Sequence, residues 1–194
     1  MNTQISTIFP TIQTKRLVIN ALAMDDIKPF FTYRTDPKVL QYQGEFPRSE
    51  ADVQDLIETQ SKVDFGTVNQ WFQFAIRLLP DNTLIGDIGL HFISPFIPQV
   101  EIAYSIIPSF QRQGYAGESV EALIDYCFSN LNIEIISATI DVRNIASQHL
   151  LQKMGFQRIA YRPHACFMRG DWCDEADYAL FFNKYTPKVN KFSA

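Results

Sequence analysis

The sequence has few cysteines, no long apolar run and no excess of basic residues, and each absence excludes a class of protein. Three cysteines, Cys127, Cys166 and Cys173, form an odd set without the spacing of a disulfide framework, which predicts reduced thiols and a cytoplasmic location. No stretch approaches the roughly 18 apolar residues of a membrane-spanning helix. The opening residues also lack the basic start and apolar run of a secretory signal. We therefore expect an intracellular protein with no membrane partner.

Charge and length narrow the class further. The 194 residues carry 17 Lys and Arg against 21 Asp and Glu, a net charge of −4, whereas nucleic-acid-binding domains usually show a basic stripe. We expect no nucleic-acid partner, while a positively charged small partner is compatible with this charge. Hydrophobic residues make up 46% of the chain, enough for a sizeable core. No stretch has the composition of a linker, so we predict one domain over residues 1–194, with its core at about 14–185.

The first half of the chain has the pattern of a sheet with two helices. Ser49 and Asp52 have the spacing of a capping box at the start of one of them. Gly86 and Gly89, inside a strand pattern, indicate a bulge or a close approach of two backbones. Periodicity and turn residues predict strands at 14–22, 70–79, 84–93 and 100–107 and helices at 24–36 and 49–60.

The second half alternates helices with strands. Residues 118–131 form an amphipathic pattern with Cys127 on its apolar face, which makes that cysteine a core residue. Gly155 has the place of a left-handed residue that ends a helix. The pattern predicts helices at 118–131 and 145–154, a strand at 134–142 and a closing hairpin around Gly170 and Asp171. The whole is a mixed sheet with helices packed on it, in the α/β or α+β class.

One stretch, PSFQRQGYAGESVEAL at 108–123, places Gly114, Ala116 and Gly117 at the entry to the long helix. Glycine costs roughly 1 kcal/mol against alanine inside a helix. The first amides of a helix have no internal partners and carry a partial positive charge. Removing side chains there lets an anion approach those amides. The stretch is either an ordinary loop or a cradle for an anion such as a pyrophosphate.

The residues of this stretch can be compared with the sequence patterns of known anion-binding turns. The Gly-Lys-Ser/Thr ending of a nucleotidase phosphate loop is missing, and so is the third glycine of the dinucleotide fingerprint. QRQGYA does match the pattern Gln/Arg-x-x-Gly-x-Gly/Ala. It resembles the pyrophosphate-binding turn of the GNAT superfamily of acetyl-coenzyme A-dependent N-acetyltransferases.

Other segments extend this resemblance over residues 14 to about 185. NIASQHLLQKMGF at 144–156 is similar to the superfamily's signature in that region. TKRLVI at the front, RTDPKVLQYQ at 34–43 and RGDWCDEADYAL at 169–180 resemble its Rim-type branch, which includes ribosomal-protein N-terminal acetyltransferases. The resemblance implies a mixed, mostly antiparallel central sheet with helices on both faces. It also implies transfer of the acetyl group of acetyl-coenzyme A (acetyl-CoA), a cosubstrate, directly to an amine without a metal.

The resemblance also implies where the cofactor is held. Two central strands would splay apart, and backbone on one of them would pair with the pantetheine arm. Asn144 would reach the pantetheine, although Asn is also among the best helix N-caps. The implied cofactor-binding residues are Ser105, Ile106, Ile107, Gln111, Arg112, Gln113, Gly114, Tyr115, Ala116, Gly117, Asn144 and Ser147.

Two residues are candidates for catalysis. Glu101 lies inside an apolar strand, on the face of Ala103 and Ser105, and could take the proton of the amine; the alternative is a salt-bridged or edge-exposed glutamate. Many members of the superfamily carry a tyrosine acid where this chain has Leu151. Ser147 is then the nearest hydroxyl implied for the departing thiolate, and it either protonates or only orients the sulfur. Tyr104 is an open alternative.

The acceptor is left open by the sequence. It could be a protein N-terminal amine or a small-molecule amine, and the protein could be a monomer or a homodimer. His164, Cys166 and Cys173 lack the ligand count and spacing of a zinc site. Without the tyrosine, a non-catalytic acyl-CoA-binding sensor is the alternative function. Candidates for the acceptor pocket are Tyr42, Phe46, Trp71, Phe74, His91 and Tyr104.

Overall fold

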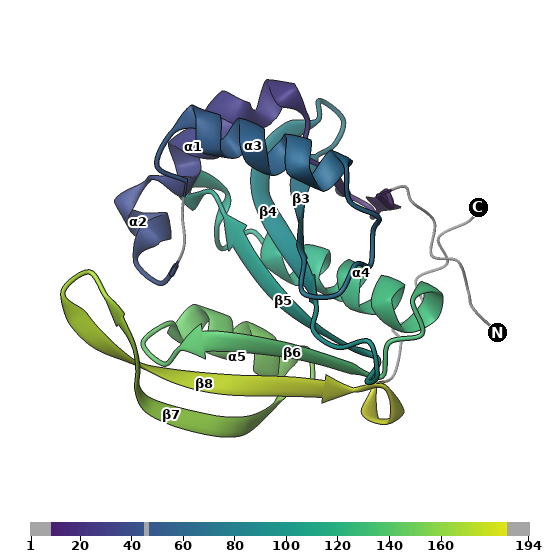
Figure 1. The fold of residues 1–194 in the computed structure, drawn as a ribbon, viewed down its shortest axis with the longest axis vertical. Coiled ribbons are helices and arrows are strands. Elements are labelled where there is room, and N and C mark those ends of the chain that lie inside the picture. The colour runs from purple at the N-terminus through teal and green to yellow at the C-terminus, as the bar shows by residue number, and fades with distance from the viewer. Residues whose placement is uncertain (1–8, 45–46, 186–194) are drawn as a thin grey trace.

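The computed structural model describes residues 9–44 and 47–185, and its strands form one eight-stranded sheet in the order β1-β2-β3-β4-β5-β6-β8-β7 (Figure 1). Neighbouring strands are antiparallel except β5 and β6, which are parallel. This confirms the mixed, mostly antiparallel sheet. The strands are β1 (Ile12–Gln13), β2 (Leu17–Ala21), β3 (Trp71–Leu78), β4 (Thr83–Phe92), β5 (Gln99–Ile106), β6 (Ile135–Asp141), β7 (Gln157–Met168) and β8 (Asp171–Phe181).

Helices cover both faces of this sheet, as predicted. Helices α1 and α3 lie over one face of β3 and β4, and α4 lies on the other (Figure 1). Helix α5 packs beside α4, where a side chain at Gly117 would meet Leu150 and Met154. No helix in the described ranges is both long and apolar enough to cross a membrane. The helices are α1 (Ile27–Arg34), α2 (Pro37–Leu40), α3 (Glu50–Ser61), α4 (Tyr115–Asn130) and α5 (Ile145–Lys153).

Most predicted elements are present, with shifted ends. Ser49 caps α3 by accepting the Asp52 amide, and Gly155 is left-handed with φ 91°, as expected. The predicted strand at 14–22 is shorter, because residues 14–16 form a turn between β1 and β2. The predicted helix at 24–36 opens with a 3-10 turn at Met24–Asp26. Helix α2 was not predicted: Asp36 caps its four residues and Pro37 occupies its first position.

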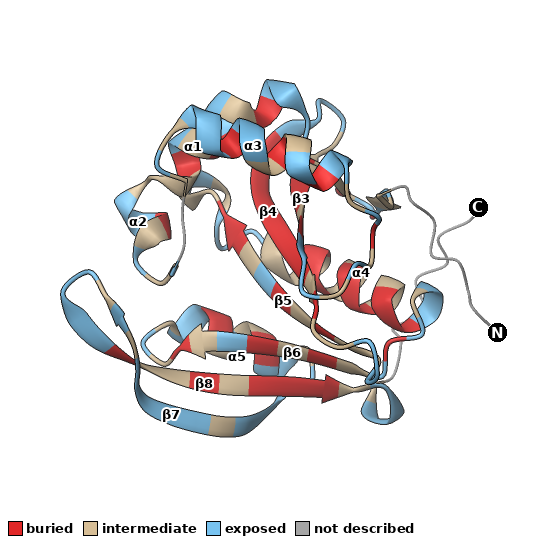
Figure 2. Ribbon diagram, viewed as in Figure 1, coloured by how far each residue is buried: buried red, intermediate tan, exposed pale blue. Residues whose placement is uncertain are grey.

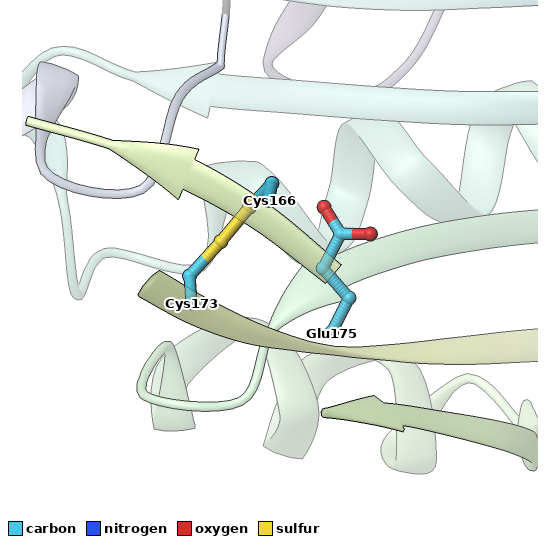
Figure 3. A group of neighbouring side chains, drawn as sticks. All are labelled: Cys166, Cys173 and Glu175. Atoms are coloured by element: carbon cyan, nitrogen blue, oxygen red, sulfur yellow. A yellow bond between two sulfur atoms is a disulfide. The ribbon is translucent and has the colours of Figure 1, made fainter. Parts of the chain in front are cut away.

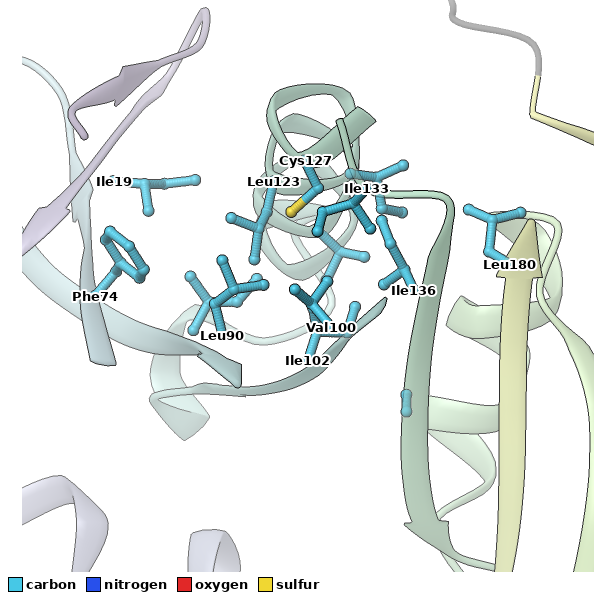
Figure 4. Close-up of a cluster of buried hydrophobic side chains, with 14 of the residues drawn as sticks. Ile19, Phe74, Leu90, Val100, Ile102, Leu123, Cys127, Ile133, Ile136 and Leu180 are labelled. Carbon is cyan, nitrogen blue, oxygen red and sulfur yellow. The ribbon is translucent and has the colours of Figure 1, made fainter. Parts of the chain in front are cut away.

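The core consists of two apolar clusters, one on each face of the sheet. The larger joins β2–β6 to α4 and includes Ile19, Phe74, Leu123 and the buried Cys127 (Figure 4). The smaller joins α1 and α3 to β3 and β4 and includes Phe30, Val53 and Ala75. Strands β3 and β4 are therefore buried on both sides, while β7 at the edge is largely exposed (Figure 2). Side chains of successive strand residues alternate between the two clusters.

Strands β5 and β6 pair over only three residues. Their register joins Gln99 to Ile135, Val100 to Ile136 and Glu101 to Ser137, and both strands continue well beyond this pairing. Figure 1 shows them diverging toward the end where α5 begins. The sheet is thus open between its two central strands, as the family resemblance implied.

Gly86 allows the backbones of β4 and β5 to approach closely near the end of β5. A Cβ atom at this position would overlap the carbonyl oxygen of Ser105 and lie 2.9 Å from Ile106 Cδ1. The register between β3 and β4 also shifts beside it, between Ile76 and Arg77. Both the bulge and the close backbone approach predicted for this region are present.

The closing hairpin corrects the expectation about the cysteines. Cys166 and Cys173 are direct partners in the β7–β8 register and form a disulfide, with their Cα atoms 5.3 Å apart (Figure 3). Their seven-residue separation is centred on the turn at Arg169 and Gly170, so antiparallel pairing places them face to face. The sequence reasoning missed this pair because it looked for the cysteine spacings of disulfide-rich domains. With the disulfide formed, the cysteine content no longer indicates a reducing compartment.

Candidate active site

The turn between β5 and α4 has a backbone that few side chains tolerate. After a 3-10 turn at Pro108–Phe110, Arg112 adopts φ 60° and Gly114 adopts φ 85°. Two left-handed residues so close together curl the chain and direct successive amides toward one side. Gly114 is the N-cap of α4, so this curl leads directly into the helix.

The amides of residues 112–117 are the main feature of this turn. The first bond of the helix runs from the amide of Glu118 to the carbonyl of Gly114, at 3.1 Å. Within the described ranges, none of the six amides before it donates to a protein acceptor. They lie where the helix dipole is positive, which suits an anion. The bare amides that the glycines predicted are therefore present, and we call this turn of residues 112–117 the cradle.

Arg16 forms one edge of the cradle and was missed by the sequence reasoning. Its Nη1 donates to the carbonyl of Gln113 at 3.0 Å, and its Nε donates to Glu118 Oε2 at 2.6 Å. The guanidinium also lies over the ring of Tyr115, 4.4 Å from its centroid. Arg16 lies in the turn just before β2, 102 residues from Glu118, so no local pattern could have placed it there. Arg112, by contrast, is exposed.

A hollow of about 390 Å³ adjoins the cradle between α4, the end of α5 and the turn that joins β1 to β2. Gly114 and Gly117 form part of its wall. Its charged lining residues are basic at Lys15 and Lys153 and acidic at Glu118, Glu121 and Asp125. It is lined by Thr14, Lys15, Gly114, Gly117, Glu118, Glu121, Ala122, Asp125, Lys153 and Met154.

The opening between β5 and β6 exposes only alternate backbone groups of β5. The amide of Ile107 donates to the carbonyl of Ile85 on the β4 side, at 2.8 Å. Since successive residues point to opposite edges of a strand, Ile106 faces the opening and Ser105 faces β4. Gln111 Nε2 donates to the carbonyl of Ile106 at 2.9 Å. The resemblance implied that the backbone of Ser105, Ile106 and Ile107 pairs with pantetheine, but of these three Ile106 alone presents its backbone to the opening.

Two hydroxyl groups meet across this opening. Tyr104 Oη on β5 and Ser147 Oγ on α5 are 2.8 Å apart, and Ser147 is only 7% exposed. Asn144 is the N-cap of α5, its Oδ1 accepting the Ser147 amide at 3.1 Å. Burial raises the pKa of Tyr104 to about 12, although its hydrogen bond to Ser147 acts in the opposite direction. Tyr104 thus faces α5, away from the acceptor-pocket candidates on the other face.

The opposite face of β5 carries Glu101. Its Oε2 lies 3.7 Å from Nδ1 of His91 on β4, the residue directly across in the register. His91 stacks on Trp71, with ring centroids 4.9 Å apart and planes 15° from parallel. Within the described ranges, His91 Nδ1 has no hydrogen-bond partner. Trp71 is 39% exposed, so this group of three side chains is accessible from outside.

A buried polar network lies farther along the same face, and the sequence reasoning missed it. Ser105 Oγ accepts from Gln43 Nε2 at 2.9 Å and from Arg34 Nη1 at 3.2 Å. Asp87 accepts from Gln73 Nε2, and its Oδ1 lies 3.8 Å from Arg34 Nη1. Burial raises the pKa of Asp87 well above its usual range and lowers that of Arg34 to about 10. An aspartate inside the apolar run LIGDIGL was the available signal.

This network borders a second hollow, of about 560 Å³, under α1 and α3. The hairpin of β7 and β8 reaches its rim, because Arg169 Nη2 donates to the carbonyl of Gln43 at 2.9 Å. The hollow opens on the face that carries Glu101 and Trp71, which makes it the candidate acceptor side. It is lined by Phe30, Arg34, Gly44, Pro47, Arg48, Asp52, Leu56 and Gln73.

Three other pocket candidates have different placements. Phe74 is fully buried in the larger core cluster, where its ring contacts those of Phe9 and Phe65, so it does not line a pocket. Tyr42 is half-buried in the segment between α2 and α3. Phe46 lies outside the described residues.

Cys166, Cys173 and Glu175 form a group whose ligand atoms lie within 4.8 Å of one another (Figure 3). The disulfide occupies both sulfur atoms, and a metal ligand must be the thiolate. His164 is outside this group and instead packs edge-on against Trp172. With the disulfide formed, these residues are not a cation site.

Comparison with known proteins places these features in a family. A family model described as an acetyltransferase (GNAT) domain matches residues 16–157, most of the chain. The uncharacterized N-acetyltransferase YoaA of Bacillus subtilis is 28% identical over 172 residues, which cover 89% of this chain and 97% of that protein.

Solved structures share the fold. The spermidine N-acetyltransferase of Vibrio cholerae, in complex with CoA and spermine, superposes with a TM-score of 0.79 at 22% identity, over 89% of this chain and 99% of that one. A ribosomal-protein-S5-alanine acetyltransferase from Vibrio fischeri has a TM-score of 0.79 at 17% identity, over 92% and 100%. The resemblance to the ribosomal-protein acetyltransferases is thus confirmed at the level of fold.

Proposed function

The chain belongs to the GNAT acetyltransferase family, and on this premise we propose that it transfers the acetyl group of acetyl-CoA directly to an amine. The observation that carries the proposal is the row of amides at residues 112–117, which donate to no acceptor in the described part of the chain. They follow β5, which has lost its pairing with β6 but keeps its pairing with β4. Hydrogen bonds to a charged group contribute roughly 1.5–3 kcal/mol each. Three or four of them would bind a pyrophosphate well.

The rest of the cofactor would follow the open edge of β5. The backbone of Ile106 faces the opening and Asn144 lies at its far side, which supports a pantetheine arm between β5 and β6. The nucleotide end would lie in the hollow beside the cradle, where Lys15 and Lys153 offer ammonium groups among three acidic side chains. When bound, acetyl-CoA supplies the activated acyl group, and the residues named here orient it.

Glu101 is the proposed base. It stands at the last paired residue of β5 and β6, at the point where the opening begins, beside His91 and Trp71. At pH 7 about a tenth of an α-amino group with a pKa near 7.7–8.0 is already unprotonated. A lysine-like amine near 10.4 needs about 4.6 kcal/mol to lose its proton. Removing the proton from an N-terminal amine is therefore within reach of a carboxylate base such as Glu101, whereas an alkylamine demands more of it.

The acceptor class remains a proposal with two members, a protein N-terminal amine and a small amine. The relatives that share the fold are named for both, since one is a spermidine N-acetyltransferase and another a ribosomal-protein-S5-alanine acetyltransferase. In this chain the acceptor would enter from the face of α1 and α3, where Trp71 and His91 border the opening.

Thermal shift with acetyl-CoA tests the cofactor part of the proposal. The variant Gly114→Glu places a bulky negative group in the cradle, and Gly170→Glu is its matched control. Both glycines are left-handed, at φ 85° and φ 81°, so both substitutions carry a strain of about 1–2 kcal/mol. At 100 times the dissociation constant, acetyl-CoA should stabilise the wild type and Gly170→Glu by about 2.7 kcal/mol. It should leave Gly114→Glu unchanged.

Thiol release on a panel of amines then tests turnover. Spermidine, free lysine and a peptide with an N-terminal alanine represent the acceptor classes. Turnover of any of them eliminates the acyl-CoA-binding sensor, whereas binding without turnover on a broad panel favours it. Equal shifts in all three proteins, or no shift in any, would remove the cradle as the basis of the function.

A further inference from the structure

The disulfide between Cys166 and Cys173 lies at the base of a short hairpin end, which we call the tip (residues 166–173). In β7, residues 163–165 bulge out opposite the single residue Asp174 of β8. Beyond this bulge the cross-strand pairs are Cys166–Cys173, Phe167–Trp172 and Met168–Asp171. Because so few pairs hold the tip, the cross-link at its base decides how firmly it keeps its shape.

The tip touches the rim of the hollow under α1 and α3. Arg169 Nη2 donates to the carbonyl of Gln43 at 2.9 Å, and a side chain at Gly44 would lie 3.8 Å from Met168 Sδ. Figure 1 shows the hairpin of β7 and β8 extending toward the loop that follows α2. Gln43 also accepts from Arg34 Nη1 at 3.2 Å. Since Gly44 and Arg34 both line the hollow, the tip supports the candidate acceptor side.

A second contact of the tip leads toward α5 and is weaker. Asp171 Oδ2 lies 3.2 Å from Arg143 Nη1, but the Asp171 side chain is 73% exposed, and exposed ion pairs contribute little. Arg143 is also held by Asp141, 2.6 Å from its Nη2, and this pair does not involve the tip. Loosening of the tip would therefore act mainly on the acceptor side.

The two sulfur atoms differ in their access to solvent. Cys166 is half-buried on the largely exposed strand β7 (Figure 2), whereas Cys173 is 1% exposed. A thiolate from solution therefore meets Cys166 first, and the rate of thiol–disulfide exchange depends on such access. Cys127, the third cysteine, is fully buried in the core and does not compete for the thiolate.

We propose that the Cys166–Cys173 disulfide is a redox-exchange site, opened by dithiols and closed again by disulfides, and that its state decides whether the tip is held against Gln43. A thiolate of the dithiol attacks Cys166 Sγ, the sulfur–sulfur bond breaks, and its electron pair goes to Cys173 Sγ, which takes a proton. The second thiol of the dithiol then attacks the mixed disulfide, and Cys166 Sγ leaves and takes a proton. The protein is reduced by two electrons and the dithiol is oxidised to a disulfide.

Hydrogen exchange read by mass spectrometry tests the coupling without any turnover. Dithiothreitol should speed amide exchange in the tip by at least about tenfold, as expected when a cross-link across a short loop is lost. It should also speed exchange in residues 37–44, the rim segment, because the contact at Gln43 is then released. Exchange in α3 should not change.

Two variants separate the disulfide from the contact that it supports. Cys166→Ser combined with Cys173→Ser should exchange like the reduced wild type, with or without dithiothreitol. Arg169→Ala keeps the disulfide but lacks the donor to the rim, so it should speed exchange in the rim segment and leave the tip slow. Arg158→Ala is the matched control, because Arg158 is also an exposed arginine of β7 but lies outside the tip. It should behave as the wild type does.

Steady-state kinetics then connect this site to the acceptor, and this part rests on the proposed function. In the double-serine variant and in Arg169→Ala, the KM for spermidine or for the alanine peptide should be at least about threefold above that of the oxidised wild type, because binding contacts at the rim are lost. The KM for acetyl-CoA should stay within about twofold, since the cradle lies at α4, on the other face. Loss of the thioester absorbance measures these rates, because a thiol reagent would also react with a dithiol.

Several results would overturn the proposal. A disulfide that resists dithiothreitol in the native protein, shown by a thiol count after the reductant is removed, would not be an exchange site. An unchanged rim segment, in the reduced wild type or in Arg169→Ala, would make the disulfide a staple of the hairpin alone. Equal KM values for the amine in all the proteins would remove the effect on the acceptor. If exchange changes as expected while no amine is acetylated, the redox-exchange site stands and the proposed function fails instead.

Discussion

Glu101 and Tyr104 lie on the same strand, β5, and project to opposite faces of the sheet. Glu101 faces His91 and Trp71 on the side of α1 and α3, while Tyr104 reaches Ser147 of α5 on the other side. The alternation of side chains along a strand causes this separation, since the two residues differ by an odd number of positions. The proposed base and the Tyr104–Ser147 pair therefore lie on opposite sides of one strand.

Glu101→Gln should lower kcat at pH 7 by about a hundredfold, the lower end of the range for general base catalysis. The loss should shrink as the pH is raised toward 9, because the amine then loses its proton in solution. The KM for acetyl-CoA should not change. Steady-state thiol release at several pH values measures kcat, its pH dependence and the KM for acetyl-CoA. Glu134→Gln, at an exposed position, is the control. Wild-type activity of Glu101→Gln at pH 7 would reduce Glu101 to a structural partner of His91.

Gly86→Ala should destabilise the fold by about 3 kcal/mol or more, at or above the upper end for overpacking. The added methyl would overlap the Ser105 carbonyl and crowd Ile106, and two paired strands cannot move apart locally. Gly117→Ala is the opposite case, because its methyl would meet Leu150 and Met154 at 3.6 and 3.7 Å. The free energy of unfolding of Gly117→Ala should rise by up to about 1 kcal/mol, because alanine has the higher helix propensity. Urea unfolding would measure the change in the free energy of unfolding of each variant. A Gly86→Ala variant as stable as the wild type would contradict the close approach of the β4 and β5 backbones.

Thiol titration should count the cysteines in three steps. The native protein without reductant should show no fast-reacting thiol, because Cys127 is buried, burial raises the pKa of its thiol, and the other two are joined. Denaturation alone should expose one thiol, and denaturation after reduction should expose three. Three thiols in the denatured, unreduced protein would show that Cys166 and Cys173 are not paired in solution.

Asp87→Asn should change how stability depends on pH. Burial raises the pKa of Asp87 in the folded state, so between its unfolded pKa and that raised value the folded state holds a proton that the unfolded state has lost. Stability of the wild type should therefore fall as pH rises through this window. The asparagine side chain does not titrate. The stability of the variant should therefore rise relative to that of the wild type as the pH rises above the unfolded pKa of the aspartate, about 4. The free energy of unfolding in urea at each pH measures the difference.

The opposite trend would also be informative. A wild type that gains stability over the variant as pH rises would mean that Arg34, 3.8 Å away, holds Asp87 ionised despite its burial. The matched substitution Arg34→Gln should then remove the trend. Either result assigns a charge state to the polar network that borders the candidate acceptor side.

Much of the fold could be predicted from the sequence because its signals are local. The apolar periodicity of α4, the capping pair at Ser49 and the left-handed Gly155 each depend on residues within a few positions. The bare amides at the start of α4 were predictable for the same reason, since Gly114 sets the backbone that leaves them unbonded. Helix α2 was missed because four residues are too few to show a period.

The sequence by itself determined the order of the elements and the cradle at the start of α4, because short-range sterics and hydrogen bonding specify both. Only the tertiary structure decided which groups meet: Arg16 at the cradle, Tyr104 with Ser147, and Cys166 opposite Cys173. The first two contacts join residues 102 and 43 positions apart, and all three depend on strand register or helix packing. Register and packing are settled by burial of the whole core, which no short stretch of sequence contains.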